Sequence, residues 1–399
     1  MLIVQKYGGT SVGTLERIEN VAARVIEAKN SGADVVAVVS AMSGVTNQLV
    51  DYASHYTKDP DGVAMDMLLS SGERVTCALL TIALINLGYP AVGLSGRLAG
   101  IITDSVHTKA RIEAIDTKRM KEELKAGKII VVAGFPGIDE KGDVTTLGRG
   151  GSDLSAVAIA GALDADLCEI YTDVDGVYTT DPRIEPKAKK LDKISYDEML
   201  ELASLGAKVL QNRSVELAKK LNVNLVTRSS FNHNEGTLIT KEESMEAVLV
   251  SGIALDKNQA RVTLRGVVDK PGIAAEIFTA LAEKNINVDM IIQNVGQDGT
   301  TNLGFTVPQN ELHVAKECMD RLNAAREILY NDEIVKVSVV GVGMKSHTGV
   351  ASLAFQTLAN EGINIQMIST SEIKISMIVD QKYGELAVRA LHEAYKLDK

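Results

Sequence analysis

The strongest restriction on the fold of this chain is an internal repeat in its last third. Residues 271–293 read PGIAAEIFTALAEKNINVDMIIQ, residues 348–370 read TGVASLAFQTLANEGINIQMIST, and nine of the 23 aligned positions are identical. Each copy follows a strand-like run (260–264 and 334–340), begins a helical pattern just after a glycine, and leads into another strand-like run. This order is the first half of a ferredoxin-like β-α-β-β-α-β unit, so the sequence predicts two small tandem modules.

The residues before the repeats show a different pattern, in which continuous apolar, β-branched runs alternate with helical stretches. Continuous runs are typical of parallel strands covered on both faces, and the alternation predicts an α/β sandwich. The expected strands are Leu2–Gln5, Val35–Ser40, Ala91–Leu94, Ile129–Ala133, Glu169–Tyr171 and Asn224–Thr227, and the expected helices are Thr14–Asn30, Met65–Leu87, Ser152–Ala162 and Ser204–Leu221.

The length of 399 residues favours more than one domain, and the charged segment Thr240–Glu246 indicates a boundary. We therefore expect a larger domain at 1–245 and a second region at 246–399 that holds the repeats. Within that region the first module is expected at about 260–332 and the second at about 333–399, with 246–258 adding a strand to the second.

The composition argues against several classes of partner. The formal net charge of −10 leaves no basic surplus for binding nucleic acid. No run approaches the roughly 18 apolar residues of a membrane span, and the first residues are too polar for a signal sequence, so we expect a cytoplasmic protein.

The six histidines show no HxxxH or HExxH spacing, so no protein-bound metal is expected. Cys77, Cys168 and Cys318 are far apart and are expected to be buried apolar side chains.

Three glycine- or hydroxyl-rich segments flanked by apolar runs carry the chemistry: KYGGT (6–10), TTLGRGGSD (145–153) and YTDVDGVYTTDPR (171–183). Each offers free backbone N–H groups together with one or two charged side chains. A site for a phosphorylated nucleotide needs such N–H groups, a few cations and a nearby carboxylate. The sequence therefore predicts one phosphoryl-transfer site that is built from several loops.

Individual residues in these segments fit particular roles. Gly8 and Gly9 let the backbone approach a phosphate, and Lys6 supplies a point charge for the transferred group. Arg149 lies between glycines that leave room for a carboxylate ligand. Asp153 falls in the first turn of the next expected helix, where it either anchors Lys6 or positions phosphate groups.

Structural explanations compete with several of these roles. The paired glycines are also a common turn, and the hydroxyls of segment 39–47 either cap a helix or bind an anion. Glu73 is either a first-turn charge favoured by the helix dipole or a carboxylate that holds a substrate ammonium group. Lys208 is either a cation near the phosphates or a solvated helix charge.

Together these motifs resemble the aspartate kinase (aspartokinase) family, in its monofunctional bacterial form with C-terminal tandem ACT domains. The resemblance covers essentially the whole chain. The matching motifs are KYGGTS (6–11), VVSAMSGVTN (38–47), SSGERV (70–75), SGRLAGIITD followed by His107 and KARI (95–112), GRGGSD (148–153), YTDVDGVYTTDPR (171–183), LASLGAKVLQNRSVELA (202–218) and VTRSSF (226–231).

The resemblance implies an amino-acid-kinase-type three-layer sandwich and transfer of the ATP γ-phosphoryl group, with Mg²⁺, to the side-chain carboxylate of L-aspartate. It assigns catalysis to Lys6, Glu73, Arg149 and Asp153. It assigns aspartate binding to Ser40, Thr46, Glu73, Arg149, Gly150, Gly151 and Ser152. It assigns the nucleotide to Lys6, Tyr7, Gly8, Gly9, Thr172, Asp173, Tyr178, Thr179, Thr180, Asp181, Pro182, Arg183 and Lys208.

The repeats imply feedback control by an end-product amino acid, lysine or threonine or both. Turn N–H groups in them would bind an α-carboxylate, although the same residues also serve as turns and helix caps. The resemblance places effector sites at Asp269, Gly272, Ile273, Ala274, Gln293 and Asn294 in the first module and at Thr348, Gly349, Val350, Asn364, Thr370, Ser371 and Glu372 in the second.

Two further questions stay open at the level of the sequence. The ACT domains imply a homodimer or an α₂β₂ assembly, the latter if Met245 starts a separate regulatory chain. The alternatives in function are a sister kinase acting on glutamate or N-acetylglutamate, and a sensor without catalysis. Glu73 and the GRGGSD loop favour free aspartate, and a sensor would have lost Lys6, Arg149 or Asp153.

Overall fold

A computed structural model gives the structure of the chain and describes residues 1–204, 210–241, 249–295, 299–345 and 347–399. The chain divides into two compact units. The first comprises 1–177 together with the described residues of 190–203 and 210–241, and the second comprises 178–189, Ser204 and the described residues from 249 onward.

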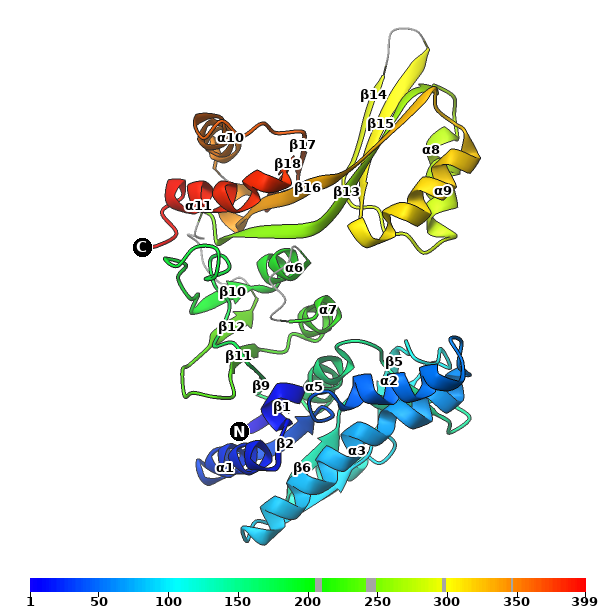
Figure 1. Ribbon diagram of the computed structural model, residues 1–399. Coiled ribbons are helices and arrows are strands. Elements are labelled where there is room, and N and C mark those ends of the chain that lie inside the picture. The colour runs from blue at the N-terminus through cyan, green and yellow to red at the C-terminus, as the bar shows by residue number, and fades with distance from the viewer. Residues whose placement is uncertain (205–209, 242–248, 296–298, 346) are drawn as a thin grey trace. The chain divides into compact units, whose positions relative to one another are not determined.

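The first unit is built on an eight-stranded sheet (Figure 1). From β11 to β3 all neighbouring strands are parallel, while β12 runs antiparallel to β11 and parallel to the end strand β10. In sheet order the strands are β10 (Lys193–Ser195), β12 (Thr237–Thr240), β11 (Leu225–Ser229), β9 (Leu167–Thr172), β1 (Leu2–Tyr7), β2 (Asp34–Val39), β6 (Ile129–Ala133) and β3 (Ala91–Leu94). The six expected strands are all present, within two residues of the expected bounds.

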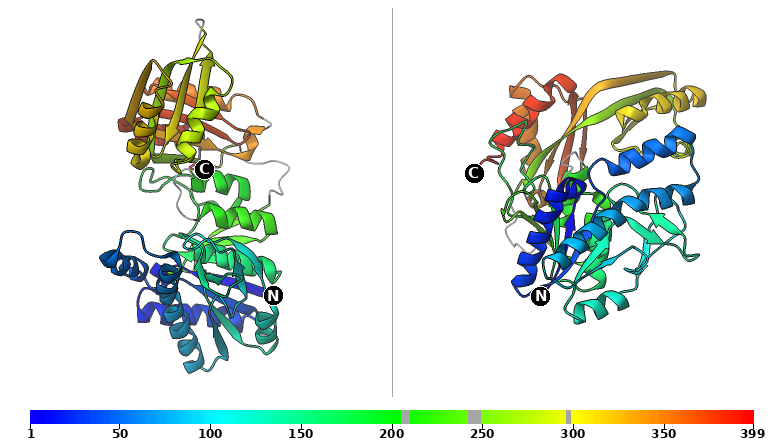
Figure 2. Two further views of the ribbon diagram at one scale, coloured as in Figure 1. Left: turned by 90° about the vertical axis from the view of Figure 1, so that its right-hand side faces the viewer. Right: turned by 60° about the horizontal axis from the view of Figure 1, so that its bottom comes forward.

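Helices cover both faces of this sheet and complete a three-layer sandwich. On one face α1 (Leu15–Asn30) and α3 (Gly62–Asn86) lie side by side and bury an aliphatic core with alternate residues of β1, β2 and β6 (Figures 1 and 2). On the other face α5 (Gly151–Ala162) packs on β1, β2 and β9, and α7 (Asn212–Leu221) packs on α5. The predicted α/β sandwich is therefore confirmed, and its central strands are buried on both faces.

The helix bounds follow from local chemistry. The Thr14 side chain accepts a hydrogen bond from the N–H of Arg17 and caps α1, whose apolar residues recur at helical spacing along the buried face. By length and composition α3 passes as a membrane-crossing helix, the only one among the described residues. It nevertheless carries the buried acids Asp66 and Glu73 and packs against α1, β3 and β6, as a core helix does. The remaining helices of this unit are α2 (Val45–Tyr56), α4 (Lys118–Lys125) and α6 (Tyr196–Ser204).

The expected helix over Ser204–Leu221 is wrong as a single element. Gln211 has an extended backbone (φ −80°, ψ 133°) and serves as the N-cap of α7, so that helix begins only at Asn212.

The sequence also did not predict a small second sheet, since its strands are too short to show a period. In sheet order these strands are β5 (Ile112–Ile115), β4 (Ile101–Thr103), β7 (Pro136–Ile138) and β8 (Val144–Thr146).

The second unit contains a six-stranded antiparallel sheet, in which residues 252–265 of the central strand β13 pair along β16 with two shifts of register. Helices α8 and α9 pack at one end of the sheet, and α10 and α11 pack at the other (Figure 1). In sheet order the strands are β14 (Ile291–Val295), β15 (Thr300–Val307), β13 (Gly252–Val268), β16 (Glu327–Val340), β18 (Lys374–Asp380) and β17 (Met367–Thr370). The helices are α8 (Ile273–Ala282), α9 (Leu312–Leu322), α10 (Val350–Asn360) and α11 (Gly384–Ala394).

The two halves of this sheet are the two ferredoxin-like modules that the repeat predicts. Residues 260–268 of β13 pair with β15, whereas residues 252–256 pair with residues 336–340 of β16, beside β18. The first part of β13 therefore supplies a strand to the second module. Helices α8 and α10 begin after Gly272 and Gly349, which both have a left-handed backbone with φ of 94°.

Candidate active site

The predicted loops leave the large sheet at one edge, the carboxyl ends of its parallel strands. Tyr7, the last residue of β1, is in register with Val39 of β2 and with Tyr171 of β9, and Val39 is in register with Ala133 of β6. Helix α5 begins at the same edge, since a Cβ placed on Gly134 would lie 3.1 Å from Cβ of Ser152. Ligands of open parallel sheets bind at this edge.

Lys6 and Asp153 form an ion pair at this edge. Lys6 Nζ on β1 lies 2.5 Å from Asp153 Oδ1 in the first turn of α5, and only 10% and 11% of the two side chains are exposed. The sequence left open whether Asp153 anchors Lys6, and the structure shows that it does. A Cβ on Gly8 would lie 3.5 Å from the same ammonium group, so the Gly8–Gly9 turn passes directly beside it.

Glu73 contacts the segment after β2, and that segment in turn lies against the Gly8–Gly9 turn. Its Oε1 accepts a hydrogen bond of 3.2 Å from the N–H of Ala41, and the carbonyl oxygen of Ala41 would lie 3.1 Å from a Cβ on Gly9. The other carboxylate oxygen, Oε2, is buried and has no hydrogen-bond partner among the described residues. Burial raises the pKa of Glu73 to about 7. A buried oxygen without a partner fits a site that awaits a donor such as a ligand ammonium group.

The structure rules out two of the competing structural explanations. Helix α3 begins at Gly62, so Glu73 lies three turns inside the helix and is not a first-turn charge. Helix α2 begins after Gly44 (φ 84°), and no side-chain hydroxyl in the described part of the chain caps it. Ser40 directly follows β2, and Thr46 lies in the first turn of α2, so both hydroxyls are placed at the edge that carries Lys6.

The loop with Arg149 joins the small sheet to α5. Gly148 and Gly150 have left-handed backbones (φ 75° and 76°), which glycine adopts without strain, and Gly150 is the N-cap of α5. Between them Arg149 is exposed, while Gly151 and Ser152 are buried in the first turn of the helix. A helix N-terminus with an adjacent exposed guanidinium suits a carboxylate ligand.

The residues expected at the nucleotide fall into both units. Thr172 ends β9 and exchanges hydrogen bonds with Val174, and Asp173 is exposed beside it; both belong to the first unit. The second half of the motif belongs to the second unit, and Lys208 lies outside the described residues. This second half comprises Tyr178, Thr179, Thr180, Asp181, Pro182 and Arg183.

Two contacts hold this second half in place. The Thr179 hydroxyl lies 2.9 Å from Nε2 of His392 on α11, and the Thr179 carbonyl accepts a 2.7 Å hydrogen bond from the N–H of Ile253. Arg183 forms an ion pair with Asp181 at 2.7 Å, which lowers the pKa of Asp181.

No group of three or more His, Cys, Asp and Glu within the described ranges is arranged to hold a metal ion.

The residues expected at the effector sites occupy equivalent places in the two modules. In each module, some of these residues lie at the N-terminus of the first helix, and the others lie on or next to the edge strand of that module, which is β14 in the first and β17 in the second. In the first module these are Asp269, Gly272, Ile273 and Ala274 near α8, with Gln293 and Asn294 on β14. In the second they are Thr348, Gly349 and Val350 near α10, Asn364 before β17, Thr370 on β17, and Ser371 and Glu372 after it.

One buried acid near the site, Asp66, was not predicted. It accepts hydrogen bonds from His107, Thr108 and Thr146, and it lies two turns before Glu73 on α3. A charged residue inside an apolar helical pattern, on the same face as Glu73, was the signal that could have revealed it.

Comparison with known proteins agrees with this architecture. The amino acid kinase family model matches residues 1–228, and the ACT domain model matches residues 262–321 and 337–395. The aspartokinase of Helicobacter pylori strain 26695 is 61% identical over the full length of both chains.

Two crystal structures of Escherichia coli aspartokinase III also match this chain. The complex with aspartate and ADP (R-state) has a TM-score of 0.83 and 26% identity, covering 99% of each chain. The complex with lysine and aspartate (T-state) has a TM-score of 0.80 and 27% identity, covering 98% of this chain and 99% of that one. The chain therefore belongs to the aspartokinase family, as an amino acid kinase domain followed by paired ACT domains.

Proposed function

We propose that this chain transfers the γ-phosphoryl group of ATP to the side-chain carboxylate of L-aspartate and so forms 4-phospho-L-aspartate. The observation that carries the proposal is a set of charged side chains at the carboxyl edge of the sheet. There Lys6 and Asp153 form a buried ion pair, and Glu73 has one carboxylate oxygen hydrogen-bonded and one buried without a partner among the described residues. Membership of the aspartokinase family supports the same reaction. The product would feed the synthesis of lysine, threonine, methionine and diaminopimelate.

The chemistry requires charge neutralisation more than proton transfer. The attacking side chain of aspartate has an ordinary pKa of about 3.9, so it is already an anion and needs no general base. The obstacle is the repulsion between this anion and the phosphates. Lys6, the N–H groups of the Gly8–Gly9 turn and the Mg²⁺ that enters as part of the MgATP substrate would reduce that repulsion and stabilise the charge of the transition state.

Asp153 gives Lys6 a fixed position before the nucleotide arrives. An ammonium group that is already oriented loses little freedom when the phosphoryl group comes into place, which is the basis of electrostatic preorganisation. For the amino acid, we assign the α-carboxylate to Arg149 and the α-ammonium group to Glu73, with Ser40, Thr46 and the N-terminus of α5 completing the site. The buried Oε2 of Glu73 has no hydrogen-bond partner within the described ranges, which supports its contact with the ammonium group.

For the nucleotide we retain Thr172, Asp173 and Tyr178 to Arg183 of segment 172–183, as the family resemblance assigns them. The Thr179 hydroxyl already bonds His392, which argues for a structural contribution from this side chain rather than a direct contact with ATP.

We also propose feedback inhibition by lysine, threonine or both, bound at the turns before α8 and α10. Escherichia coli aspartokinase III, a relative of similar fold, has been crystallised with lysine in its T-state. A Cβ added at the left-handed Gly272 or Gly349 would meet no atom of the described residues within 4 Å, and this open space suits binding of an α-carboxylate by turn N–H groups. An effector inhibits only if it binds the less active arrangement more tightly.

Assembly through the ACT domains is part of the proposal, as a homodimer or as α₂β₂. The edge strand β14 exposes Ile291 and Val295, whose exposed fractions are 51% and 75%. An exposed apolar edge strand is a ready pairing surface. Molar mass from light scattering, with a search for a short second chain, distinguishes the two assemblies.

The reaction is tested by hydroxamate formation in hydroxylamine with MgATP and either L-aspartate or L-glutamate. We expect activity with aspartate only, reduced when lysine, threonine or both are added. Equal activity with glutamate would instead indicate a sister kinase, and no activity with either amino acid would indicate a sensor.

A further inference from the structure

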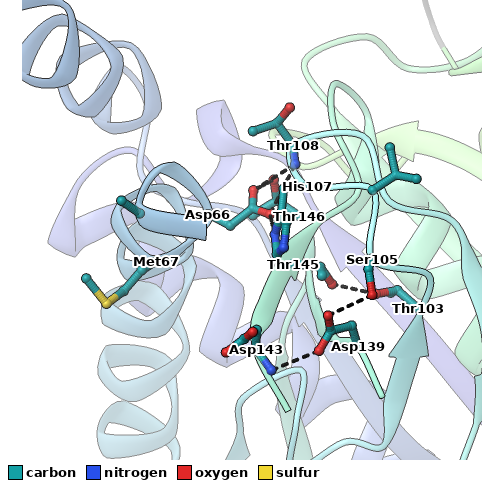
Figure 3. Close-up of polar contacts among 12 residues, drawn as sticks. Asp66, Met67, Thr103, Ser105, His107, Thr108, Asp139, Asp143, Thr145 and Thr146 are labelled. Atoms are coloured by element: carbon teal, nitrogen blue, oxygen red, sulfur yellow. Dashed lines mark hydrogen bonds and ion pairs between the residues drawn. The ribbon is translucent and has the colours of Figure 1, made fainter. Parts of the chain in front are cut away.

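The carboxylate of Asp66 is fully buried on α3 and organises the segment that follows β4. Its Oδ2 lies 2.9 Å from Nδ1 of His107, both oxygens lie 3.0 Å from the N–H of Thr108, and Oδ1 accepts a 2.5 Å bond from the Thr146 hydroxyl (Figure 3). Because an ionised carboxylate only accepts hydrogen bonds, His107 must carry its proton on Nδ1. Burying an acid is costly unless donors surround it, so this network holds its members firmly.

The residue that Asp66 holds most directly is strained. Thr108 has a left-handed backbone with φ of 65°, which is rare for a β-branched residue and costs roughly 1–3 kcal/mol. Such a conformation persists only where surrounding contacts impose it, and here the two oxygens of Asp66 do so through the Thr108 N–H. Strain of this kind concentrates at functional sites.

The strained backbone lies against the loop that carries Arg149. A Cβ on Gly148 would be 3.1 Å from the carbonyl oxygen of Thr108, so the two backbones are in close contact one residue before Arg149. Arg213 of α7 ties the same two segments together, donating to the carbonyl oxygens of Leu147 (2.8 Å) and Ala110 (3.2 Å). The base of the Arg149 loop is therefore fixed from two sides.

We propose that Asp66 and His107 are positioning residues that set the Arg149 loop for recognition of the substrate α-carboxylate. They act through Thr108 and Thr146 and do not touch the substrate. The inference rests on the proposed function, in which Arg149 binds that carboxylate. Since Asp66 and Glu73 lie two turns apart on one face of α3, a single helix would align both ends of the bound amino acid.

His107 is the better position for a test, because it is partly exposed whereas Asp66 is fully buried. His107→Ala removes the donor to Asp66, and His107→Asn restores a donor near the place of Nδ1. The matched control is Asp139→Asn. Asp139 directly follows β7 and is also a buried carboxylate. It accepts hydrogen bonds from Ser105 and from the N–H group of Asp143 (Figure 3), and from the N–H group of Lys141, and these donors differ from the donors to Asp66.

The measurement is calorimetric binding of L-aspartate and of its α-amide, which keeps the ammonium group and the side-chain carboxylate but lacks the α-carboxylate. We expect His107→Ala to reduce the preference for aspartate over the amide roughly tenfold, His107→Asn to restore it, and Asp139→Asn to leave it unchanged. A merely structural role for His107 would weaken binding of both ligands equally, and that result would overturn the inference, as would a wild-type chain without any preference. A wild-type chain that prefers aspartate but does not phosphorylate it would contradict only the proposed function.

Discussion

Lys6 Nζ lies 2.5 Å from Asp153 Oδ1, and this contact joins the end of the central strand β1 to the first turn of α5. Both side chains are largely buried, so neither charge is well solvated without the other. The pair therefore contributes in two ways, since it holds the sheet to the helix and it fixes a cation where a phosphoryl group would be transferred.

Replacing Lys6 should affect both contributions. We expect Lys6→Ala to reduce kcat by roughly 10³-fold or more, because the transferred group loses its point charge. The same change leaves Asp153 buried and unpaired, which costs about 3–5 kcal/mol of unfolding free energy. Steady-state kinetics and urea unfolding measure the two effects.

A double-mutant cycle separates the two effects. In Lys6→Ala/Asp153→Ala no unpaired charge remains, so its loss of stability should be smaller than the sum of the two single losses. Turnover should not recover. Additive losses of stability, or near wild-type turnover in Lys6→Ala, would contradict the role given to this pair.

Glu73 predicts a pH dependence of aspartate binding. Its pKa is raised to about 7 by burial, and an ammonium ligand requires its anionic form. We expect the affinity for aspartate to rise by up to about tenfold per pH unit as the pH approaches 7 and to level off above it. Calorimetry across this range measures the effect, and Glu73→Gln should bind weakly with no such slope. A wild-type affinity that stays constant through pH 7 would argue against contact between Glu73 and the ammonium group.

Stability of the unliganded protein should follow the opposite trend. Because the folded pKa of Glu73 is above its ordinary value of 4.5, the neutral form is favoured by folding. Its contribution is complete below pH 4.5 and is lost as the pH rises through 7. Thermal unfolding should therefore show Glu73→Gln gaining stability relative to the wild-type chain as the pH is raised through that range.

Some of these features could be predicted from the sequence and others could not. The six expected strands and the glycine turns before α8 and α10 follow from local patterns, namely continuous apolar runs and the repeat. For Asp153 the sequence predicts two possible roles, one of which is the ion pair with Lys6. It does not decide between them, because the two residues are far apart in the sequence and only the sheet brings them together. The network of Asp66 depends on three segments meeting in space, and no local pattern indicates such a meeting.

The motif YTDVDGVYTTDPR shows a further limit of sequence reasoning. It reads as one continuous loop, but residues from 178 onward belong to the second unit, where Thr179 bonds Ile253 and His392. Residues 178 onward belong to the second unit because of contacts with residues more than seventy positions away in the sequence, and a local motif does not reveal such contacts.

His392 should make the second unit sensitive to acid. It is buried beside Thr179, and burial lowers its pKa below the ordinary 6.5. The neutral ring therefore contributes stability that is present above pH 6.5 and is lost as the pH falls through the folded pKa. We expect the thermal stability of the second unit to fall as the pH is lowered below about 6.5, and that of His392→Gln to fall less. The matched control is His55→Gln on the exposed face of α2, which should retain the wild-type slope.

The glycines before α8 and α10 test the effector sites. Gly272 and Gly349 both have φ of 94° with open space around the added Cβ, so alanine should cost only backbone strain, about 1–2 kcal/mol of unfolding free energy. The added methyl group would stand where an effector carboxylate approaches the turn. We therefore expect at least one of Gly272→Ala and Gly349→Ala to raise the effector concentration for half-inhibition by at least roughly fivefold.

Gly362→Ala is the control for strain alone, because Gly362 has φ of 69°, equally open surroundings, and a place after α10 at the opposite end of that helix. It should lose similar stability and keep the wild-type response to lysine or threonine. If all three alanine variants shift inhibition by the same factor, the shift reflects loss of stability in the module and not an effector bound at its turns. If only the Gly272 or Gly349 variant shifts it, the variant that does so identifies the module that binds the effector.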